Sequence, residues 1–168
     1  MNAQSYIDIA ARIRAKVPVC RSIDIYNAQY EEPNKHQPLS YPCVLIEWLP
    51  TEWDSLGNNA QDGRGGFRIH CVVNSMNSTY NLDTKTPTQQ GLSLQHLQFQ
   101  KQVHDALQNF APCDYTSLQR IRTVPDHRYS SVLVFIHEYR AGELYQPSDP
   151  NITMHVVEDF PTTGEIVS

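Results

Sequence analysis

The chain has 168 residues and a mass of 19.2 kDa, of which 40% are hydrophobic, so it is long and apolar enough for one domain with its own core. This composition excludes a wholly disordered chain, and apolar runs such as residues 132–136 are too short for a membrane-spanning helix. The net charge of −5 argues against a general nucleic-acid binder, which is usually basic.

Residues 5–17 are predicted to form an amphipathic helix that ends at Pro18, because proline disrupts a helix interior. The apolar side chains that share one face of this helix are Tyr6, Ile9, Ile13 and Val17. Ile23 and Ile25 then alternate with polar residues, which indicates a short strand.

Two longer strands are predicted at residues 43–49 and 67–73, where side chains alternate between two faces. On the first strand Val44, Ile46 and Trp48 point one way, and Cys43, Leu45 and Glu47 point the other. The residues between the strands, 51–66, are rich in Gly, Asn and Asp, which suit turns. The simplest connection is therefore a long antiparallel hairpin arm.

Residues 74–91 are almost wholly polar and are predicted to form a long loop. A second helix is predicted to begin at Ser93, with Leu92 and Leu97 packed together as a hydrophobic staple. Pro112 marks the exit from this segment. The buried face of the helix is predicted to contain Val103, Ala106, Leu107 and Phe110.

Residues 115–124 alternate poorly and predict a weak strand, whereas residues 130–139 predict a central strand buried on both faces. From Gly142 the chain changes character, with a Pro-containing linker and a weakly alternating segment at 151–160. The order of elements predicts an α+β domain at residues 1–141, with two helices on one face of a mainly antiparallel sheet, and an extended C-terminal arm at 142–168.

One common core is expected for the apolar positions of these helices and strands. Its predicted members are Ile9, Ile13, Val44, Ile46, Ile69, Val103, Leu107, Val134 and Ile136.

Residues that could carry chemistry are few. No spacing of the seven histidines matches a metal motif. His70 and His137 could neighbour each other in the sheet, and we expect both to be structural residues held by hydrogen bonds. Cys43 and His70 could approach across the hairpin, which leaves a small cytoplasmic Cys/His enzyme as an alternative function. Without a third positioning residue, structural packing is favoured, and neither a metal nor a cofactor is expected.

The order of elements over residues 3–140 resembles the tail terminator (tail-completion) proteins of long-tailed bacteriophages. The residues that carry the resemblance are the Pro42-Cys43-Val44-Leu45-Ile46-Glu47 strand, Trp53, Gly57, Gln61 and Gly63 of the connection, and residues 67–73.

The resemblance implies a non-enzymatic virion protein that forms a ring, a hexamer in the family, at the head-proximal end of the tail tube. Its implied partners are further copies of the chain, the tail tube protein and a neck or stopper protein, with DNA passing through the lumen without sequence recognition. The implied location is the tail-neck junction of a virion assembled in the host cytoplasm. Another neck ring, an adaptor or stopper, is the alternative within this class. The acidic balance suits a surface that DNA passes without binding.

Contacts between subunits are expected where long polar segments carry isolated aromatic or charged side chains. The candidate interface residues are Trp53, Arg64, Tyr80, Met154 and Phe160. The 151–160 segment is expected to add as a strand to a neighbouring subunit, with pairing to its own sheet or disorder as the alternatives.

Overall fold

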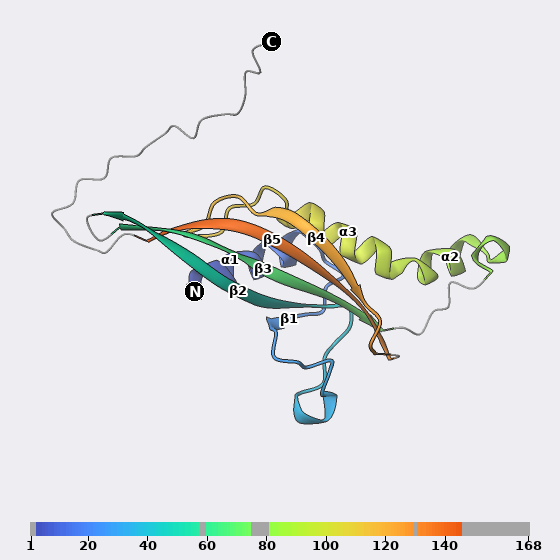
Figure 1. The fold of residues 1–168 in the computed structure, drawn as a ribbon. Coiled ribbons are helices and arrows are strands. Elements are labelled where there is room, and N and C mark those ends of the chain that lie inside the picture. Colours follow the sequence, from blue (N-terminus) through green and yellow to red (C-terminus); the bar gives the residue numbers. More distant parts are fainter. Residues whose placement is uncertain (1–2, 58–59, 75–80, 130, 146–168) are drawn as a thin grey trace, which may run out of the picture.

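The computed structural model describes residues 3–57, 60–74, 81–129 and 131–145, and shows an α+β fold built on one five-stranded sheet (Figure 1). The predicted fold class is confirmed. None of the helices in these residues is long and apolar enough to cross a membrane.

The strands of the sheet lie in the order β1-β2-β3-β5-β4. Their bounds are β1 Ser22–Ile25, β2 Cys43–Gly57, β3 Ala60–Asn74, β4 Gln119–Asp126 and β5 Val132–Tyr145. β1 pairs with β2 in parallel and the other neighbours are antiparallel, so the sheet is mixed but mainly antiparallel. The prediction of a central strand is confirmed, because β5 lies between β3 and β4.

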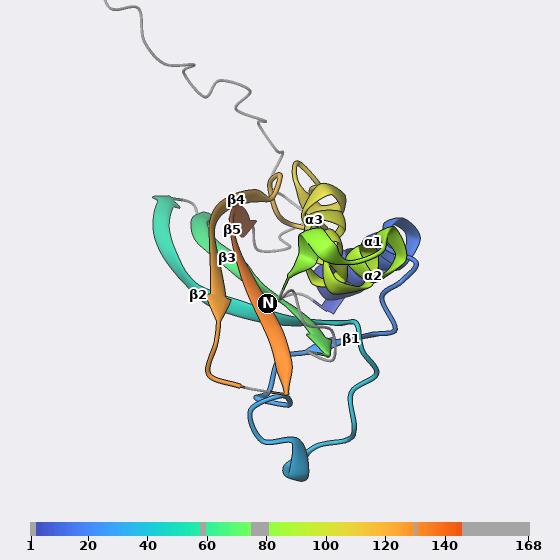
Figure 2. The same cartoon turned by 90° about the vertical axis from the view of Figure 1, so that its right-hand side faces the viewer.

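Three helices lie on one side of the sheet, as Figure 2 shows: α1 Ala3–Lys16, α2 Pro87–Ser93 and α3 Gln95–Leu107. The predicted helix at 5–17 is confirmed as α1, and its apolar stripe enters the core. The main core also takes side chains from α3 and from the helix-facing side of β2, β3 and β5. Its fully buried members include Ile9, Ile13, Val17, Val44, Ile46, Phe67, Ile69, Val103, Leu107 and Tyr139.

The region before α3 differs from the prediction of a loop followed by a helix at Ser93. α2 begins at Pro87, where the Thr86 hydroxyl and the Gln89 side chain form a reciprocal capping box. Ser93 is the last residue of α2, and Leu92 is exposed, so the predicted hydrophobic staple is wrong. The capping residues determine where α2 starts. Because this segment has few apolar residues, it lacks the periodic pattern from which a helix is predicted.

A second, smaller apolar cluster lies on the side of the sheet that faces away from the helices. We term this side the open face. Tyr30, Leu45, Val72, Val132 and Val134 are buried in this cluster. The expectation of one common core is therefore wrong for two of its nine members. Val134 belongs to this second cluster and Ile136 is only partly buried against it, because alternate residues of β5 point to opposite faces of the sheet.

The predicted hairpin arm is confirmed, and its strands continue much further than expected. β2 runs to Gly57 and β3 begins at Ala60, so the residues described in the arm are almost all paired strand. β5 continues past residue 141 to Tyr145, which is opposite Gln61, and so adds a third strand to the arm. The predicted C-terminal segment therefore begins inside a strand.

The weak strand predicted at 115–124 is present, shifted to Gln119–Asp126. Ile121 and Val124 are exposed on it, whereas Leu118, just before the strand, is buried. The poor alternation seen in the sequence reflects this position at the edge of the sheet, where one side of the strand has no neighbouring strand among the described residues.

Candidate functional site

The hairpin arm places two of the predicted interface residues on the surface. Trp53 lies on β2 opposite Gly63, and 40% of its surface is exposed. Arg64 lies on β3 opposite Glu52, with 71% of its side chain exposed, and its guanidinium is 3.6 Å from the Asp54 carboxylate. Strand pairing brings these two residues to almost the same level of the arm, but Trp53 points to the helix-bearing face of the sheet and Arg64 points to the open face.

The other three candidate interface residues, Tyr80, Met154 and Phe160, lie outside the described residues, as does the segment 151–160. Their role in an interface stays a prediction.

A network of charged side chains crosses the open face of the sheet. Glu138, which is buried on β5, accepts a hydrogen bond from Arg68 Nε at 3.0 Å and one from Arg122 Nε at 2.7 Å. Arg68 also lies 3.6 Å from Glu47 on β2. The network therefore links four neighbouring strands through one buried carboxylate.

His70 extends this charged network toward the second apolar cluster. Its Nε2 donates to Glu47 Oε2 at 3.0 Å, and its Nδ1 accepts a hydrogen bond from the Tyr30 hydroxyl at 2.9 Å. The imidazole also stacks on the Tyr26 ring, with centroids 4.2 Å apart. Burial lowers the pKa of His70 below its ordinary value, although the hydrogen bond to Glu47 opposes this shift, so the ring is neutral at neutral pH.

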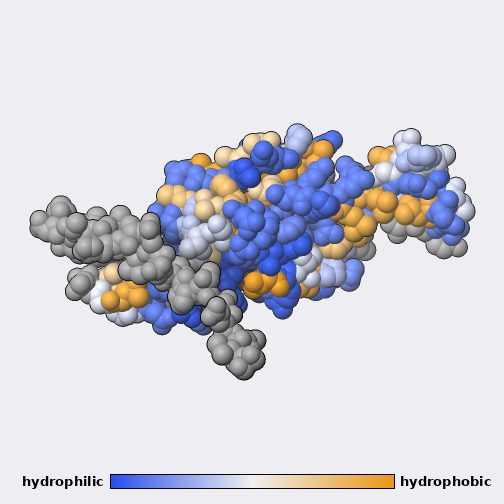
Figure 3. Space-filling view, turned by 90° about the horizontal axis from the view of Figure 1, so that it is seen from above, coloured by the Kyte–Doolittle hydropathy of each residue, from blue (hydrophilic) through white to orange (hydrophobic). Residues whose placement is uncertain are grey.

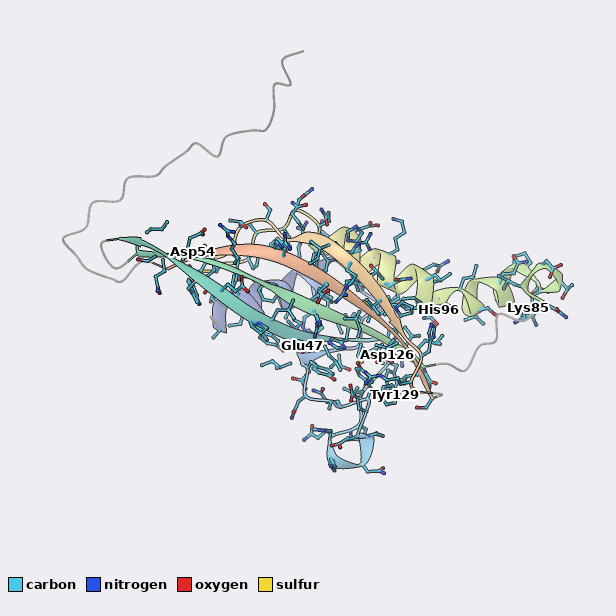
Figure 4. The ribbon with its side chains drawn as sticks, viewed as in Figure 1. Glu47, Asp54, Lys85, His96, Asp126 and Tyr129 are labelled. Atoms are coloured by element: carbon cyan, nitrogen blue, oxygen red, sulfur yellow. The ribbon has the colours of Figure 1, made fainter. Side chains whose placement is uncertain are left out.

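These side chains line a hollow of about 270 Å³ on the open face. Its rim includes Arg128, which makes a two-point contact with Asp126 at the end of β4. The hydrogen bonds from Arg128 hold the pKa of Asp126 below its usual value. Figure 4 places Asp126 and Tyr129 at the opposite end of the sheet from Asp54 on the arm.

The geometry argues against a nucleophile made from Cys43 and His70. Both residues are on the open face, but Cys43 lies opposite Val72 and is fully buried. Burial raises the pKa of the Cys43 thiol to about 12, so the reactive thiolate is absent at neutral pH. His70 is already occupied by Tyr30 and Glu47.

His70 and His137 do not form a pair. β3 and β5 are neighbours, but His137 is opposite Ile69 and therefore points to the helix-bearing face, away from His70. His137 Nε2 donates to the Gln100 carbonyl at 3.2 Å, and Nδ1 accepts from the Thr123 hydroxyl at 2.9 Å. Both histidines are hydrogen-bonded structural residues, as expected. In the described part of the chain, no cluster of three or more His, Cys, Asp or Glu side chains could hold a metal ion.

Sequence reasoning missed the charged network. Glu47, Arg68 and Glu138 each lie on a predicted strand, but they come together only through the sheet order β2-β3-β5. The one available signal was a charged residue inside each of three apolar strands.

Seen from above, the surface is mostly hydrophilic in its middle, with separate small hydrophobic groups (Figure 3).

The comparisons with known proteins found matches among solved structures. No protein-family model matches the chain, and no curated protein matches it. Among 25 matching chains of solved structures is one from "Virion of native gene transfer agent (GTA) particle". It aligns with a TM-score of 0.52 and 11% sequence identity, over 86% of this chain and 100% of that chain. At this identity, the likeness shows a shared fold.

Proposed function

We propose that this chain is a structural virion protein of a phage-like particle, and that it forms a ring at the junction of tail and head. The observation that carries the proposal is the fold likeness, which spans the whole of a chain from a gene transfer agent virion. The order of elements in the sequence, which resembles that of tail terminator proteins, also supports a structural virion protein.

The arrangement of the charged residues agrees with a structural role. The open-face network satisfies its charges internally, with Glu138 between two arginines and His70 between Tyr30 and Glu47. The hairpin arm, in contrast, extends a three-stranded ribbon with exposed aromatic and charged side chains. Such a ribbon is suited to contact a neighbouring protein.

In the finer form of the proposal, the ring is a hexamer that caps the tail tube and joins it to the neck, with DNA passing through its lumen. The net charge of −5 supports a conduit, because like charge weakens contact with phosphate. An adaptor or stopper ring is the alternative within the same class.

The test is to delete the gene and image the particles that form. Loss of a tail terminator should give tails of uncontrolled length, because the ring stops growth of the tube. Loss of an adaptor or stopper should instead give tails of normal length that are not joined to heads. Particles that form normally without the protein would contradict both versions.

A second measurement uses the purified full-length chain. Its mass in solution, measured by light scattering and native mass spectrometry over a range of concentrations, should include a closed oligomer. Imaging of tagged particles should then locate the chain at the tail-neck junction. A chain that is monomeric at every concentration and absent from purified particles would contradict the proposal.

A further inference from the structure

In the described part of the chain, the sheet has free edges along the outer side of β1, along the part of β2 that β1 does not cover, and along the outer side of β4. β1 pairs with β2 only over Cys43–Ile46, so the remainder of β2 has β3 on one side only. β4 likewise pairs only with β5. Edges of this kind present backbone N–H and C=O groups that can pair with a strand from another chain.

Prolines and one side chain limit where pairing can occur. Pro50 lies on β2 and Pro125 on β4, and neither has a backbone N–H to donate. The backbone N–H of Arg120 donates to the Gln108 side chain at 3.2 Å. On β2 and β4, the segments left for pairing are therefore residues 51–57 and residues 121–124.

The two edges carry opposite charge. Residues 51–57 contain Glu52 and Asp54 and no cation. β4 carries Arg120 and Arg122, and its carboxylate, Asp126, is buried and bonded to Arg128. The two β2 carboxylates and the two β4 arginines are exposed. Asp54 forms an ion pair with Arg64, and Arg122 forms one with Glu138. Within the described residues, Glu52 and Arg120 have no ion-pair partner, but they point to opposite faces of the sheet. On the open face, the acidic side chains of the β2 edge therefore have Arg122 as their counterpart on the β4 edge.

Exposed apolar side chains accompany these charges. On β2, 40% of Trp53 and 60% of Leu56 are exposed, and on β4, 51% of Ile121 is exposed. Exposed β-prone apolar residues on a sheet edge are usually avoided, because they promote association. Their presence on both edges indicates that these edges are covered in the assembled state.

We propose that the outer edge of β2 at residues 51–57 of one copy pairs with the outer edge of β4 at residues 121–124 of the next copy. In a sheet continued this way, Trp53 and Arg120 lie on the helix-bearing side, and Glu52, Asp54 and Arg122 lie on the open side. The two edges are at different places in the strand order, so each copy uses one edge of each kind. Such a head-to-tail contact forms a ring when the rotation between successive copies closes, and an open filament when it does not. The inference rests on the proposed function, since it specifies how the proposed ring is joined.

The first test reverses the charge of each edge separately in the full-length chain. One variant carries Glu52→Lys with Asp54→Lys, and the other carries Arg120→Glu with Arg122→Glu. Each alone faces like charge across the joint, so we expect its association to weaken by about tenfold or more, because like-charge juxtaposition at an interface is costly.

Mixing the two variants is the decisive step. In the mixture, every arm can meet an oppositely charged β4 edge if the two variants alternate around an even-numbered ring. We expect the mixture to recover the oligomer that neither variant forms alone, measured by native mass spectrometry. Circular dichroism and thermal unfolding must first show that each variant is folded.

Matched controls change the same charge at exposed positions away from both edges. Asp83→Lys with Glu32→Lys adds positive charge, and Arg14→Glu with Lys16→Glu adds negative charge. Both controls should assemble like the unmodified chain. If they lose assembly to the same extent as the edge variants, net charge is the cause and the edge pairing is wrong.

A photo-cross-link tests the contact without changing a charge. Benzoylphenylalanine in place of Leu56, in a mixture of ¹⁴N and ¹⁵N chains, should form mixed-isotope cross-links to peptides from residues 119–126. Cross-links to β1 or to residues 146–168 instead would overturn the pairing and leave the ring intact. If the unmodified chain forms no oligomer at all, both the pairing and the proposed ring fail.

Discussion

Gly63 lies directly beneath the indole ring of Trp53. A Cβ atom placed at residue 63 would be 2.7 Å from Cζ3 of that ring, which is too close for any real contact. The small residue therefore allows the tryptophan to lie flat on β3, so that the exposed aromatic of the hairpin arm is held by its own hairpin.

The first prediction compares Gly63 with Gly66 on the same strand. The Trp53 ring is half-exposed and can move outward, so Gly63→Ala should change the free energy of unfolding by no more than about 1 kcal/mol. A Cβ at Gly66 would instead be 2.1 Å from the Tyr139 backbone oxygen, which can move only if β3 and β5 separate. Gly66→Ala should therefore cost about 3 kcal/mol, at the upper end for overpacking. Urea unfolding measures both, and equal costs would contradict this account.

The second prediction separates assembly from folding at Trp53. Trp53→Ala should leave the monomer folded and weaken association, because the indole is on the arm and outside both apolar clusters. The matched control is Trp48→Ala, since Trp48 packs on Tyr6 and Phe67 at the main core and its loss should destabilise the fold. Light scattering reports assembly and thermal unfolding reports stability. A Trp53→Ala chain that unfolds would show that the residue has a core role.

The third prediction concerns the buried carboxylate of the open-face network. Glu138→Gln removes the negative charge between Arg68 and Arg122, so it should cost about 2–3 kcal/mol of stability. Asp105→Asn is the control, because its ion pair with Lys101 is exposed and should contribute less than about 1 kcal/mol. Both are measured by urea unfolding at neutral pH. Similar small costs for the two variants would mean that the network is dispensable for folding.

The parts of the fold that the sequence predicted are those with a strong local pattern. The three- and four-residue spacing of Tyr6, Ile9 and Ile13 identified α1. Alternation identified residues 43–49 of β2 and 67–73 of β3, but not their continuation into the arm. The start of α2 was also encoded locally, in the capping pair Thr86 and Gln89, but few apolar residues accompany it. Periodicity alone cannot detect such a polar helix.

The charged network could not be predicted, because it depends on long-range register. Glu138 meets Arg68 only because β5 pairs with β3 at that register, although 70 residues separate them in the chain. Similarly, His70 and His137 lie on neighbouring strands, yet one residue of register decides that they point to opposite faces. Local patterns identify strands, whereas the site requires their order and offset.

The fourth prediction is a loss of stability at mildly acidic pH. Burial lowers the pKa of His137 from 6.5 to about 4. The unfolded chain therefore binds a proton at a higher pH than the folded chain, and the free energy of unfolding should fall as the pH drops from about 6.5 to about 4. The shift corresponds to roughly 3 kcal/mol over this window. The lowered pKa of His70 adds a change of the same sign.

His137→Gln tests this assignment, because glutamine can still hydrogen-bond but does not titrate. The variant should be less stable at pH 7 and should lose less stability between pH 7 and pH 4.5 than the unmodified chain. Urea unfolding at several pH values gives both quantities. An unchanged pH dependence would show that other groups cause the loss.

The last prediction concerns the residues after the sheet. β5 ends at Tyr145, and Glu143 pairs with both Gly63 on β3 and Tyr115 in an isolated bridge. Deletion of residues 143–168 would therefore remove part of the arm as well as the C-terminal segment. Deletion of residues 146–168 leaves every described strand complete, and is the cleaner test of whether the segment joins subunits.

We expect the chain lacking residues 146–168 to keep its thermal stability and to associate more weakly, since the 151–160 segment is proposed to add to the sheet of a neighbouring subunit. The chain lacking 143–168 should lose stability as well, because three residue pairs between β3 and β5 disappear with it. Thermal unfolding and light scattering on both truncations separate the two effects. Normal assembly of the shorter deletion at normal yield would show that the segment is dispensable, and strand exchange through it would then be wrong.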